Sequence, residues 1–389
     1  MNELTGGIVM EPPRSLFSIS GVKAFRATRE ELKRARHLPG YVYTSPEFEE
    51  YEKDRIFMRD WLCVGRAEEL PRRGDYMTMR IMGEPVLLTR GGKDGLNAFA
   101  NVCRHRGAEV ALGAGNAREF RCPHHGWTYD LRGDLRDAPC MDDSAVNLAG
   151  CGLPTLRSAV HRGWVFLTFN ADPPPLAEVL AEFDREFAAF RPEDCRLADK
   201  TVIDLDCNWK FAIEHLMDLY HLRAVHRRGV AETDRGDRGC APAKLLPRGA
   251  YSCFFEAAPT AAGGESFGRM PWLQDKPESL ACLGFLAPNL NFAADAGALR
   301  HLVTWPLAPN RSRVIVYTLL PAESLGAPGV AERLSAHVER QQRAIEEDHG
   351  MLRSRQNGVG SRYFDPGPLS KLEGPIHHVI NHYLDAMTG

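Results

Sequence analysis

The segment CRHRGAEVALGAGNAREFRCPHHGWTYD, residues 103–130, decides what this chain is built around. It holds two candidate metal-binding pairs in the pattern C-x-H, sixteen intervening residues, C-x-x-H, namely Cys103 with His105 and Cys122 with His125. Two matched pairs of this kind are typical of a metal site. In a structural zinc finger the two cysteines usually stand together in the chain and so do the two histidines, whereas here each loop supplies one of each. The arrangement favours a Rieske 2Fe-2S cluster, in which one iron binds both thiolates and the other iron binds both imidazoles.

A second group of candidate ligands lies in NWKFAIEHLMDLYHLRAVH, residues 208–226, where Asp218, His221 and His226 stand as D-x-x-H-x4-H. Two histidines and one carboxylate form the facial triad that holds a mononuclear non-haem Fe(II) and leaves positions open for dioxygen and substrate. The segment has a helical pattern. On a helix Asp218 and His221 share a face, but His221 and His226 lie about 140° apart. Convergence of both histidines on one ion therefore predicts that the helix ends or distorts between them.

Both segments resemble one family. CRHRGA (103–108) and CPHHGWTYDLRGDL (122–135) closely resemble the cluster-binding loops of Rieske-type non-haem iron oxygenases, and Asn-Trp-Lys at 208–210 with the element that follows resembles the same family. Respiratory Rieske proteins have an extra cysteine in each loop, where this chain has Arg106-Gly107 and Pro123-His124. The resemblance covers nearly the full chain and identifies it as similar to the large (alpha) subunits of aromatic-ring-hydroxylating dioxygenases.

The resemblance implies that an acidic residue on a late helix completes the iron triad a few residues before a glutamine. Asp348, eight residues before Gln356, is the candidate, and Glu346 and Glu347 are neighbours that an alternative register would use. His215 competes as a ligand, but it falls outside the family spacing and is expected not to bind the metal.

Asp218 has a different implied role. In the family, a carboxylate at this position lies between the cluster of one subunit and the iron of the next, so Asp218 is expected to hydrogen-bond one ligand histidine of each centre. His105 or His125 would then come from the neighbouring subunit. This arrangement would orient both rings and give the electron a short path. The same resemblance implies a head-to-tail homotrimer, with or without a small beta subunit.

The implied fold is α+β, with an N-terminal all-β Rieske domain and a C-terminal helix-grip domain, in which an antiparallel sheet wraps the long helix that carries Asp348. We expect an N-terminal arm over residues 1–40, the Rieske 2Fe-2S domain with a preceding helix over 41–170, and the catalytic mononuclear iron domain over 171–389. Short strand-like runs separated by turn residues support the all-β part. The boundary is placed at the prolines of ADPPPL, which favour an extended spacer.

The composition excludes several classes of function. The 389 residues are 44% hydrophobic and 25% charged, which is typical of a folded globular chain. A net charge of -3 provides no basic surface for a phosphate backbone. No apolar run reaches the length of about 18 residues that a membrane span requires, and the N-terminus lacks the pattern of a secretion signal. We therefore expect a cytoplasmic protein with neither nucleic acid nor membrane as a partner.

The two candidate centres predict a terminal oxygenase, because a mononuclear iron needs a nearby electron store to activate dioxygen and the Rieske cluster is such a store. The chain has no Gly-rich dinucleotide motif, so the electrons are expected from a separate NAD(P)H-dependent reductase or ferredoxin. The expected reaction is mono- or dihydroxylation of an aromatic or similar small organic substrate, as in aromatic hydrocarbon catabolism. Oxidative N- or O-demethylation and quaternary-amine monooxygenation are alternatives within the family. A Rieske electron carrier without oxygenase activity and a structural zinc protein are the alternatives of a different class.

Overall fold

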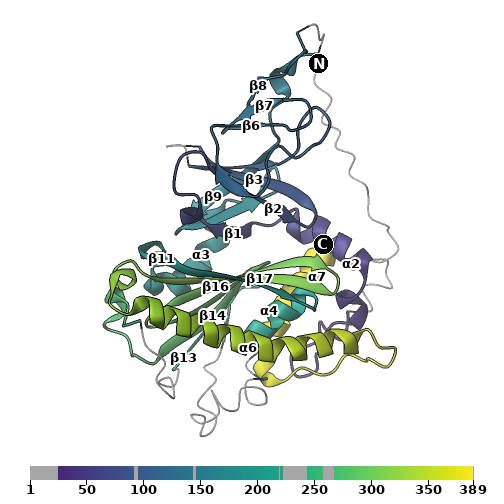
Figure 1. The fold of residues 1–389 in the computed structure, drawn as a ribbon. Helices are drawn as coiled ribbons and strands as arrows, with labels where there is room; N and C mark the ends of the chain where they lie inside the picture. The colour runs from purple at the N-terminus through teal and green to yellow at the C-terminus, as the bar shows by residue number, and fades with distance from the viewer. Residues whose placement is uncertain are drawn as a thin grey trace.

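The computed structural model describes residues 25–91, 95–142, 146–218, 220–221, 243–256 and 267–388. Its strands form three antiparallel sheets, two of them built from strands in the N-terminal half and one from strands in the C-terminal half. Figure 1 shows the N-terminal sheets stacked above the C-terminal sheet, with the longest helix, α6, below that sheet. The result is the α+β arrangement that we predicted, an all-β half followed by an antiparallel sheet on a long helix.

The N-terminal half consists of short strands joined by tight turns. Its larger sheet has seven strands in the order β1-β10-β9-β4-β3-β2-β5, and β6-β7-β8 form a separate sheet. Apolar runs correctly predict β1 to β4 and β10, whereas β5 to β8 are too short to show a periodic pattern and β9 is mostly polar. The bounds are β1 (Leu62–Arg66), β2 (Asp75–Ile81), β3 (Glu84–Arg90), β4 (Leu96–Ala100), β5 (Ala114–Asn116), β6 (Glu119–Arg121), β7 (Thr128–Asp130), β8 (Leu135–Asp137), β9 (Thr155–His161) and β10 (Trp164–Thr168).

The tip of this half, which carries β6 to β8, has its own small core. Cys103 and Cys122 belong to it, together with Phe120, Trp127 and Tyr129, and all five are buried. The main core of the molecule is continuous across both halves and is distinct from this one. Both predicted cluster cysteines are therefore packed in this second core, which also includes Leu87 of β3 and Phe99 of β4, and not in the main core.

The C-terminal half contains a seven-stranded antiparallel sheet in the order β11-β17-β16-β15-β14-β13-β12. One face of this sheet meets the N-terminal half, since His301 lies 4.1 Å from Trp164 and 4.7 Å from Phe292 between ring centroids. The bounds are β11 (Cys195–Leu205), β12 (Lys244–Leu245), β13 (Tyr251–Glu256), β14 (Leu280–Leu286), β15 (Leu290–Asp295), β16 (Leu299–Ala308) and β17 (Arg311–Pro321).

Helices cover both faces of the C-terminal sheet. In Figure 1, α4 (Trp209–Met217), α6 (Val330–Val359) and α7 (Gly374–Thr388) lie on the face away from the N-terminal half, and α3 (Leu176–Phe187) lies on the opposite face. The long helix α6 confirms our prediction. We did not predict α7, although its buried residues repeat at helical spacing: Ile376, Val379, Ile380, Tyr383, Leu384 and Met387. Among the described helices, none is both long and apolar enough to cross a membrane.

The segment before β1 packs on the C-terminal half. Ser45 caps α2 (Pro46–Glu52), as the Ser-Pro signal predicts, and the helix continues as a π-helical turn over Lys53–Phe57. Further upstream, Arg36 forms a β-bridge with Pro368 in the connection between α6 and α7. The described part of the predicted N-terminal arm is therefore folded against the C-terminal half, and the predicted domain limits stay predictions.

Candidate metal centres

Two loops at the tip of the N-terminal half contain the four predicted cluster ligands, Cys103 and His105 between β4 and β5, and Cys122 and His125 between β6 and β7. Both loops close in the same way. The backbone N–H of each cysteine donates to the carbonyl five residues later at 2.8 Å, and the N–H of Gly107 or Gly126 donates back to the cysteine carbonyl at 2.9 or 3.1 Å. The φ angles of the two glycines are +79° and +78°, a conformation that glycine adopts without the steric cost of a side chain.

The thiols and the imidazoles lie at different depths. Cys103 and Cys122 are buried, whereas His105 and His125 are exposed. The Nδ1 atoms of the two histidines are 3.1 Å apart. Two nitrogens that each lie about 2.1 Å from one metal, at a tetrahedral angle, are about 3.4 Å apart. The residues therefore fit a Rieske cluster whose imidazole-bound iron faces the surface and whose thiolate-bound iron lies beneath it.

Tyr129 contacts the inner ligands, a role that the sequence did not indicate. Its hydroxyl lies 3.2 Å from the Sγ of Cys103 and accepts the N–H of Arg104 at 3.0 Å. Burial raises the pKa of the Cys103 thiol, but hydrogen bonds with Tyr129 and with the backbone of His105 outweigh burial, and the pKa is lowered overall. The site thus favours the thiolate, which is the form that binds iron.

The two exposed histidines also have properties that favour metal binding, a fixed ring for His105 and a lowered pKa for His125. Trp127 stacks on His105 with 5.2 Å between ring centroids and 10° between ring planes, which holds that ring in place. Desolvation, followed by the nearby positive charges of His124, His105 and Arg106, lowers the pKa of His125. A lowered pKa favours the neutral imidazole, which is the ligand form.

The second candidate site begins where α4 ends. We predicted a helical pattern through residues 208–226, but α4 ends at Met217, before His221, and Asp218 follows in an extended conformation. The Oδ1 atom of Asp218 accepts the N–H groups of Tyr220 at 2.7 Å and His221 at 3.3 Å, and this turns the chain back. The expectation of a shared helix face was therefore wrong, but the turn still brings His221 Nδ1 to 3.4 Å from Asp218 Oδ2.

Asp218 is ionised at neutral pH. Burial raises the pKa of its carboxyl group, but the hydrogen bond and the charge of His221, together with the backbone N–H groups of Tyr220 and His221, outweigh burial and lower the pKa overall. A carboxylate on Nδ1 fixes the orientation of an imidazole and directs its Nε2 toward a metal, which is the arrangement commonly seen behind metal-binding histidines.

Buried polar contacts hold α6 against α4. The Asn208 side chain accepts the N–H of Lys210 at 3.1 Å and so caps the N-terminus of α4. The side chain of Gln356 accepts the N–H of Asn208 at 2.8 Å and donates to the carbonyl of Tyr43 at 3.1 Å. Because Asp348 lies about two turns before Gln356 on α6, this contact sets the position of its carboxylate beside α4.

Three side chains that can bind a metal converge at this point. One ligand atom from each of His215, His221 and Asp348 lies within 4.8 Å of the other two. The Nε2 of His215 is 3.0 Å from Asp348 Oδ2, and the rings of His215 and His221 are 4.1 Å apart between centroids. Two imidazoles and one carboxylate suit a mononuclear non-haem iron. The structure thus brings together two of the predicted ligands, His221 and Asp348, with His215, which we expected to stand aside.

The other candidate ligands are His226 and the two acidic residues next to Asp348. His226 lies outside the described residues. Glu346 and Glu347, the neighbours that another helix register would use, are exposed, whereas Asp348 is partly buried toward α4. The register with Asp348 facing inward is therefore the one that the helix adopts.

A cavity of about 610 Å³ adjoins this group of residues. His215, Asp218 and His221 line it, and so does the aromatic side chain of Phe211. The cavity reaches the surface at Tyr363, whose exposed fraction is 89%. The site is therefore accessible from solvent in the single chain.

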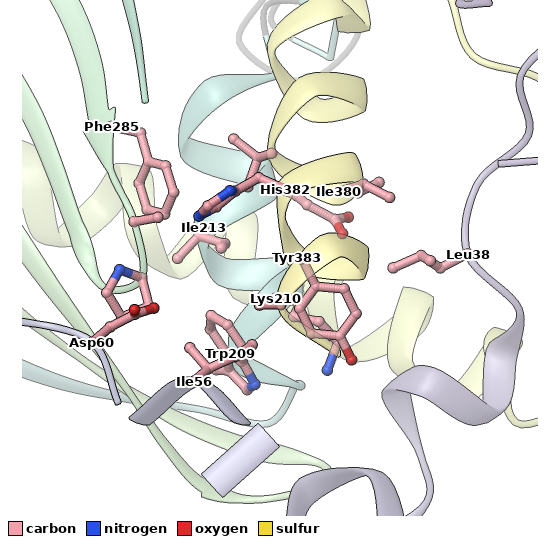
Figure 2. A pocket seen from close by; sticks show the side chains of 15 residues that line it. Leu38, Ile56, Asp60, Trp209, Lys210, Ile213, Phe285, Ile380, His382 and Tyr383 are labelled. Carbon is pink, nitrogen blue, oxygen red and sulfur yellow. The ribbon is translucent and has the colours of Figure 1, made fainter. Parts of the chain in front are cut away.

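A second cavity lies on the other side of α4 and is not a binding site. Figure 2 shows it between Trp209 and Ile213 of α4, Tyr383 of α7 and Phe285 of β14. Its volume is about 30 Å³, room for one or two water molecules at most. None of the candidate metal ligands lines it.

Buried charges beside this cavity hold α4 in position. Lys210 forms an ion pair with Glu52 of α2, and both side chains are almost fully buried, with 4% and 1% exposed. Glu52 also accepts hydrogen bonds from Trp209 Nε1 and from the Tyr383 hydroxyl, each at 2.7 Å. Burial lowers the pKa of Lys210, and the charge of Glu52 opposes this shift. One carboxylate thus connects α2, α4 and α7 behind the candidate iron site.

A second buried carboxylate lies closer to the site. Glu214, the residue before His215, accepts a hydrogen bond from Tyr43 at 2.8 Å and one from Arg355 of α6 at 2.6 Å. On α6 this contact lies directly next to that of Gln356, and on α4 it lies six residues after Asn208. The two contacts together hold α4 against α6.

Known proteins match the chain in the same two parts. The family models for the Rieske [2Fe-2S] domain and for the ring hydroxylating alpha subunit (catalytic domain) match residues 60–157 and 192–389. The oxygenase subunit of glycine betaine monooxygenase from Pseudomonas aeruginosa is 26% identical over 400 residues, which cover 94% of this chain and 92% of that one. The alpha subunit of biphenyl 2,3-dioxygenase from Rhodococcus jostii is 35% identical over 199 residues, which cover 49% and 43%. A solved structure of a quaternary ammonium Rieske monooxygenase has the same fold, with a TM-score of 0.78 at 24% identity over 91% of this chain and 96% of that one.

These matches agree with the geometry of both centres. Proteins of this family bind a Rieske 2Fe-2S cluster and a mononuclear iron, and they work with dioxygen, a substrate and a separate reductase. A Rieske electron carrier or a zinc protein would not account for the catalytic domain that fills the C-terminal half. The chain belongs to the Rieske-type ring-hydroxylating alpha subunits and is a terminal oxygenase.

Proposed function

We propose that this oxygenase holds its two centres with the residues that the sequence indicates: the cluster with Cys103, His105, Cys122 and His125, and the iron with His221, His226 and Asp348. The observation that carries this proposal is the approach of His221 and Asp348, which come from distant parts of the sequence to one group of ligand atoms, and His221 also lines the adjoining cavity. The alternative acids on α6 are exposed, which supports Asp348 further.

Iron and acid-labile sulfide per chain test this assignment on anaerobically purified protein. About three irons and two sulfides are expected, with the EPR signal of a reduced Rieske cluster. His221→Ala should lose about one iron while its visible cluster spectrum is retained. Loss of the cluster irons from that variant would instead show that the ligands have been divided wrongly between the two centres.

The residues of the chain have separate tasks in this proposal. Iron at the second site supplies the positions at which dioxygen is activated. Asp218 orients His221 through the 3.4 Å contact with Nδ1. Glu214 and Gln356 hold α4 and α6 together, so that the carboxylate of Asp348 stays at the site while the open cavity admits a substrate.

Electron transfer between subunits is part of the proposal. Figure 1 shows the cluster-bearing tip at one end of the molecule, beyond the C-terminal sheet from α4 and α6. Within one chain the electron would have to cross that sheet, whereas a head-to-tail trimer would bring the exposed His105 and His125 of one subunit to Asp218 of the next. Inter-subunit electron transfer is described for the quaternary ammonium Rieske monooxygenase that shares the fold.

Mixing subunits tests this arrangement. Chains with His221→Ala and chains with Cys122→Ala are each inactive in the proposal, but co-expressed they should regain about a quarter of the wild-type turnover, because one in four random neighbour pairs joins the two intact centres. Mixed trimers without activity would contradict transfer between subunits. Size-exclusion chromatography with light scattering provides the control that mixed trimers form.

We place quaternary ammonium compounds first among the substrates. Relatives that match almost the full length of this chain are glycine betaine monooxygenase subunits, whereas the fold is shared by a quaternary ammonium monooxygenase and by naphthalene 1,2-dioxygenase alike. Hydroxylation of a carbon next to nitrogen uses one O2, two electrons and two protons, and it releases water and an aldehyde when the C–N bond breaks. Aromatic-ring hydroxylation is the second candidate, because the alpha subunit of biphenyl 2,3-dioxygenase is 35% identical over about half of the chain.

The products distinguish the two substrate classes. With a reductase and NADH, a quaternary amine substrate should give one aldehyde per NADH consumed, and an aromatic substrate should give a hydroxylated or diol product without aldehyde. The opposite order of the two substrate classes would follow from two results together. Every amine tested would give only hydrogen peroxide from NADH oxidation, and an aromatic compound would be hydroxylated in a coupled reaction.

A further inference from the structure

We propose that His215 is an additional ligand of the mononuclear metal, beside His221 and Asp348. This inference rests on the proposed function, since it presumes that the metal binds at this group. His215 is almost fully buried, with 9% of its side chain exposed, and it lines the same cavity as His221. The sequence led us to expect that His215 does not bind the metal, whereas the geometry points to contact with it.

The end of α4 explains why the two imidazoles meet. His215 lies in the last turn of the helix, and its carbonyl accepts the N–H of Asp218 at 3.2 Å. Asp218 then turns the chain back through its hydrogen bonds to the N–H groups of Tyr220 and His221. The returning chain lays the ring of His221 over that of His215, with 4.1 Å between centroids and 31° between planes.

The spacing of the ligand atoms fits one ion. Two ligand atoms about 2.1 Å from a metal, at the right angle of an octahedral site, are about 3.0 Å apart. The Nε2 of His215 and the Oδ2 of Asp348 are 3.0 Å apart, and His221 contributes a ligand atom within 4.8 Å of both. His215 would therefore join the two histidines and the carboxylate of the proposed triad as a further nitrogen ligand.

The competing explanation is a plain hydrogen bond from His215 to the carboxylate of Asp348. Such a bond would make His215 a positioning residue that holds Asp348 and does not touch the metal. The two explanations differ in what a substitute side chain must supply. A hydrogen-bond donor is enough in one case, and a metal-binding atom is needed in the other.

Cobalt binding to the full-length, cluster-loaded protein separates them. After the mononuclear metal is removed, Co2+ is titrated into wild type, His215→Asn and His215→Cys, and the difference absorption spectrum is recorded. His215→Asn removes the imidazole and its contact with Asp348, so both explanations predict a weaker Co2+ affinity, by about tenfold or more. Only a ligand role predicts that the ligand-field spectrum changes as well, because the metal then loses a nitrogen ligand. His215→Cys should add a thiolate-to-cobalt charge-transfer band in the near ultraviolet, because a thiol that binds metal is deprotonated.

A histidine in a similar contact provides the control. His161 lies 2.6 Å from Asp184, far from the site in the N-terminal half, and His161→Asn should leave the Co2+ affinity and spectrum unchanged. The proposal is overturned if His215→Asn keeps the wild-type Co2+ ligand-field spectrum, whatever its affinity, and His215→Cys adds no thiolate band. The His215→Asn result decides the question if the cysteine variant does not fold.

His221→Ala separates this failure from failure of the proposed function. If Co2+ binding is lost in His221→Ala but the Co2+ ligand-field spectrum is unchanged in His215→Asn, the metal site stands and only the role of His215 is rejected. If Co2+ binds equally well to His221→Ala, the metal site itself is assigned wrongly, and the inference about His215 falls with it.

Discussion

The two metal centres of this chain are built in contrasting ways. Each cluster loop is one short continuous segment, closed by backbone hydrogen bonds that are the same in both loops. The candidate iron site has no such local frame, because its residues come from the end of α4 and from the middle of α6. Side-chain contacts such as the one between Gln356 and Asn208 hold these helices in register. A locally closed site can be recognised from spacing, whereas an assembled site depends on contacts made far along the chain.

The largest effect is expected from removing an inner cluster ligand. Cys122→Ala should abolish the cluster and lower reductase-dependent turnover by at least about a thousandfold, because the electron store is lost. Iron, sulfide and the visible spectrum measure the cluster directly. Cys195→Ala, at another buried cysteine outside the tip, should keep the cluster spectrum. If Cys122→Ala also lost its mononuclear iron, the two centres would not be independent in the way that their construction suggests.

A smaller effect, still large on turnover, is expected at Asp218, the residue that we propose as the bridge between the two centres. Asp218→Ala should keep both metals and lower turnover by at least about a hundredfold, since a carboxylate that supports a ligand histidine has effects of this order. Metal content and single-turnover kinetics distinguish this from loss of iron. The exposed Asp204, which pairs with Arg313 on the surface, provides the control as Asp204→Asn. Normal turnover by Asp218→Ala would remove the bridging role.

The buried ion pair behind the candidate iron site predicts a loss of stability in the C-terminal half that the cluster loops should not share. Glu52→Gln leaves the buried Lys210 without its counter-charge and should lower the free energy of unfolding by about 3 kcal/mol. Chemical denaturation measures the loss, and mononuclear iron should be released before the cluster spectrum fades. Glu50→Gln, at an exposed acid of the same helix, should change stability by less than about 0.5 kcal/mol. Loss of both metal centres in a single unfolding step would contradict the prediction that the two sites differ in stability.

The smallest effect concerns the tuning of the cluster. Tyr129→Phe removes the hydroxyl that lies 3.2 Å from Cys103 Sγ. A hydrogen bond to this sulfur stabilises the more negative, reduced cluster, so its loss should lower the reduction potential by about 40 mV, which corresponds to a bond of about 1 kcal/mol. Redox titration followed by EPR measures the shift. Tyr76→Phe, in the same domain, should leave the potential unchanged, and an equal shift there would remove the assignment to the Tyr129 hydrogen bond.

The sequence predicted the two regions to different degrees. The cluster loops could be predicted because their ligands, their glycines and their spacing lie within residues 103–130. We expected the helix to end or distort between His221 and His226, but α4 ends earlier, at Met217, because helical periodicity does not show that Asp218 turns the chain. The place of His215 depends on that turn and on α6, so spacing alone could not reveal it. The signal for α7 was present in its apolar residues, whereas the contact of Tyr129 with Cys103 exists only in the folded tip.

The chain ahead of β1 has a consequence for how the molecule can be divided. Three residues before the N-terminal sheets contact the C-terminal half: Glu52 forms an ion pair with Lys210, Tyr43 donates a hydrogen bond to Glu214, and Arg36 forms a β-bridge with Pro368. The leading segment thus completes the C-terminal half. That half is therefore a discontinuous domain, and the sheets that carry the cluster are an insertion between its two pieces. A fragment that starts near residue 171 would leave Lys210 charged and buried without a partner carboxylate from α2. The oxygenase half consequently reaches its final packing only with the leading segment in place.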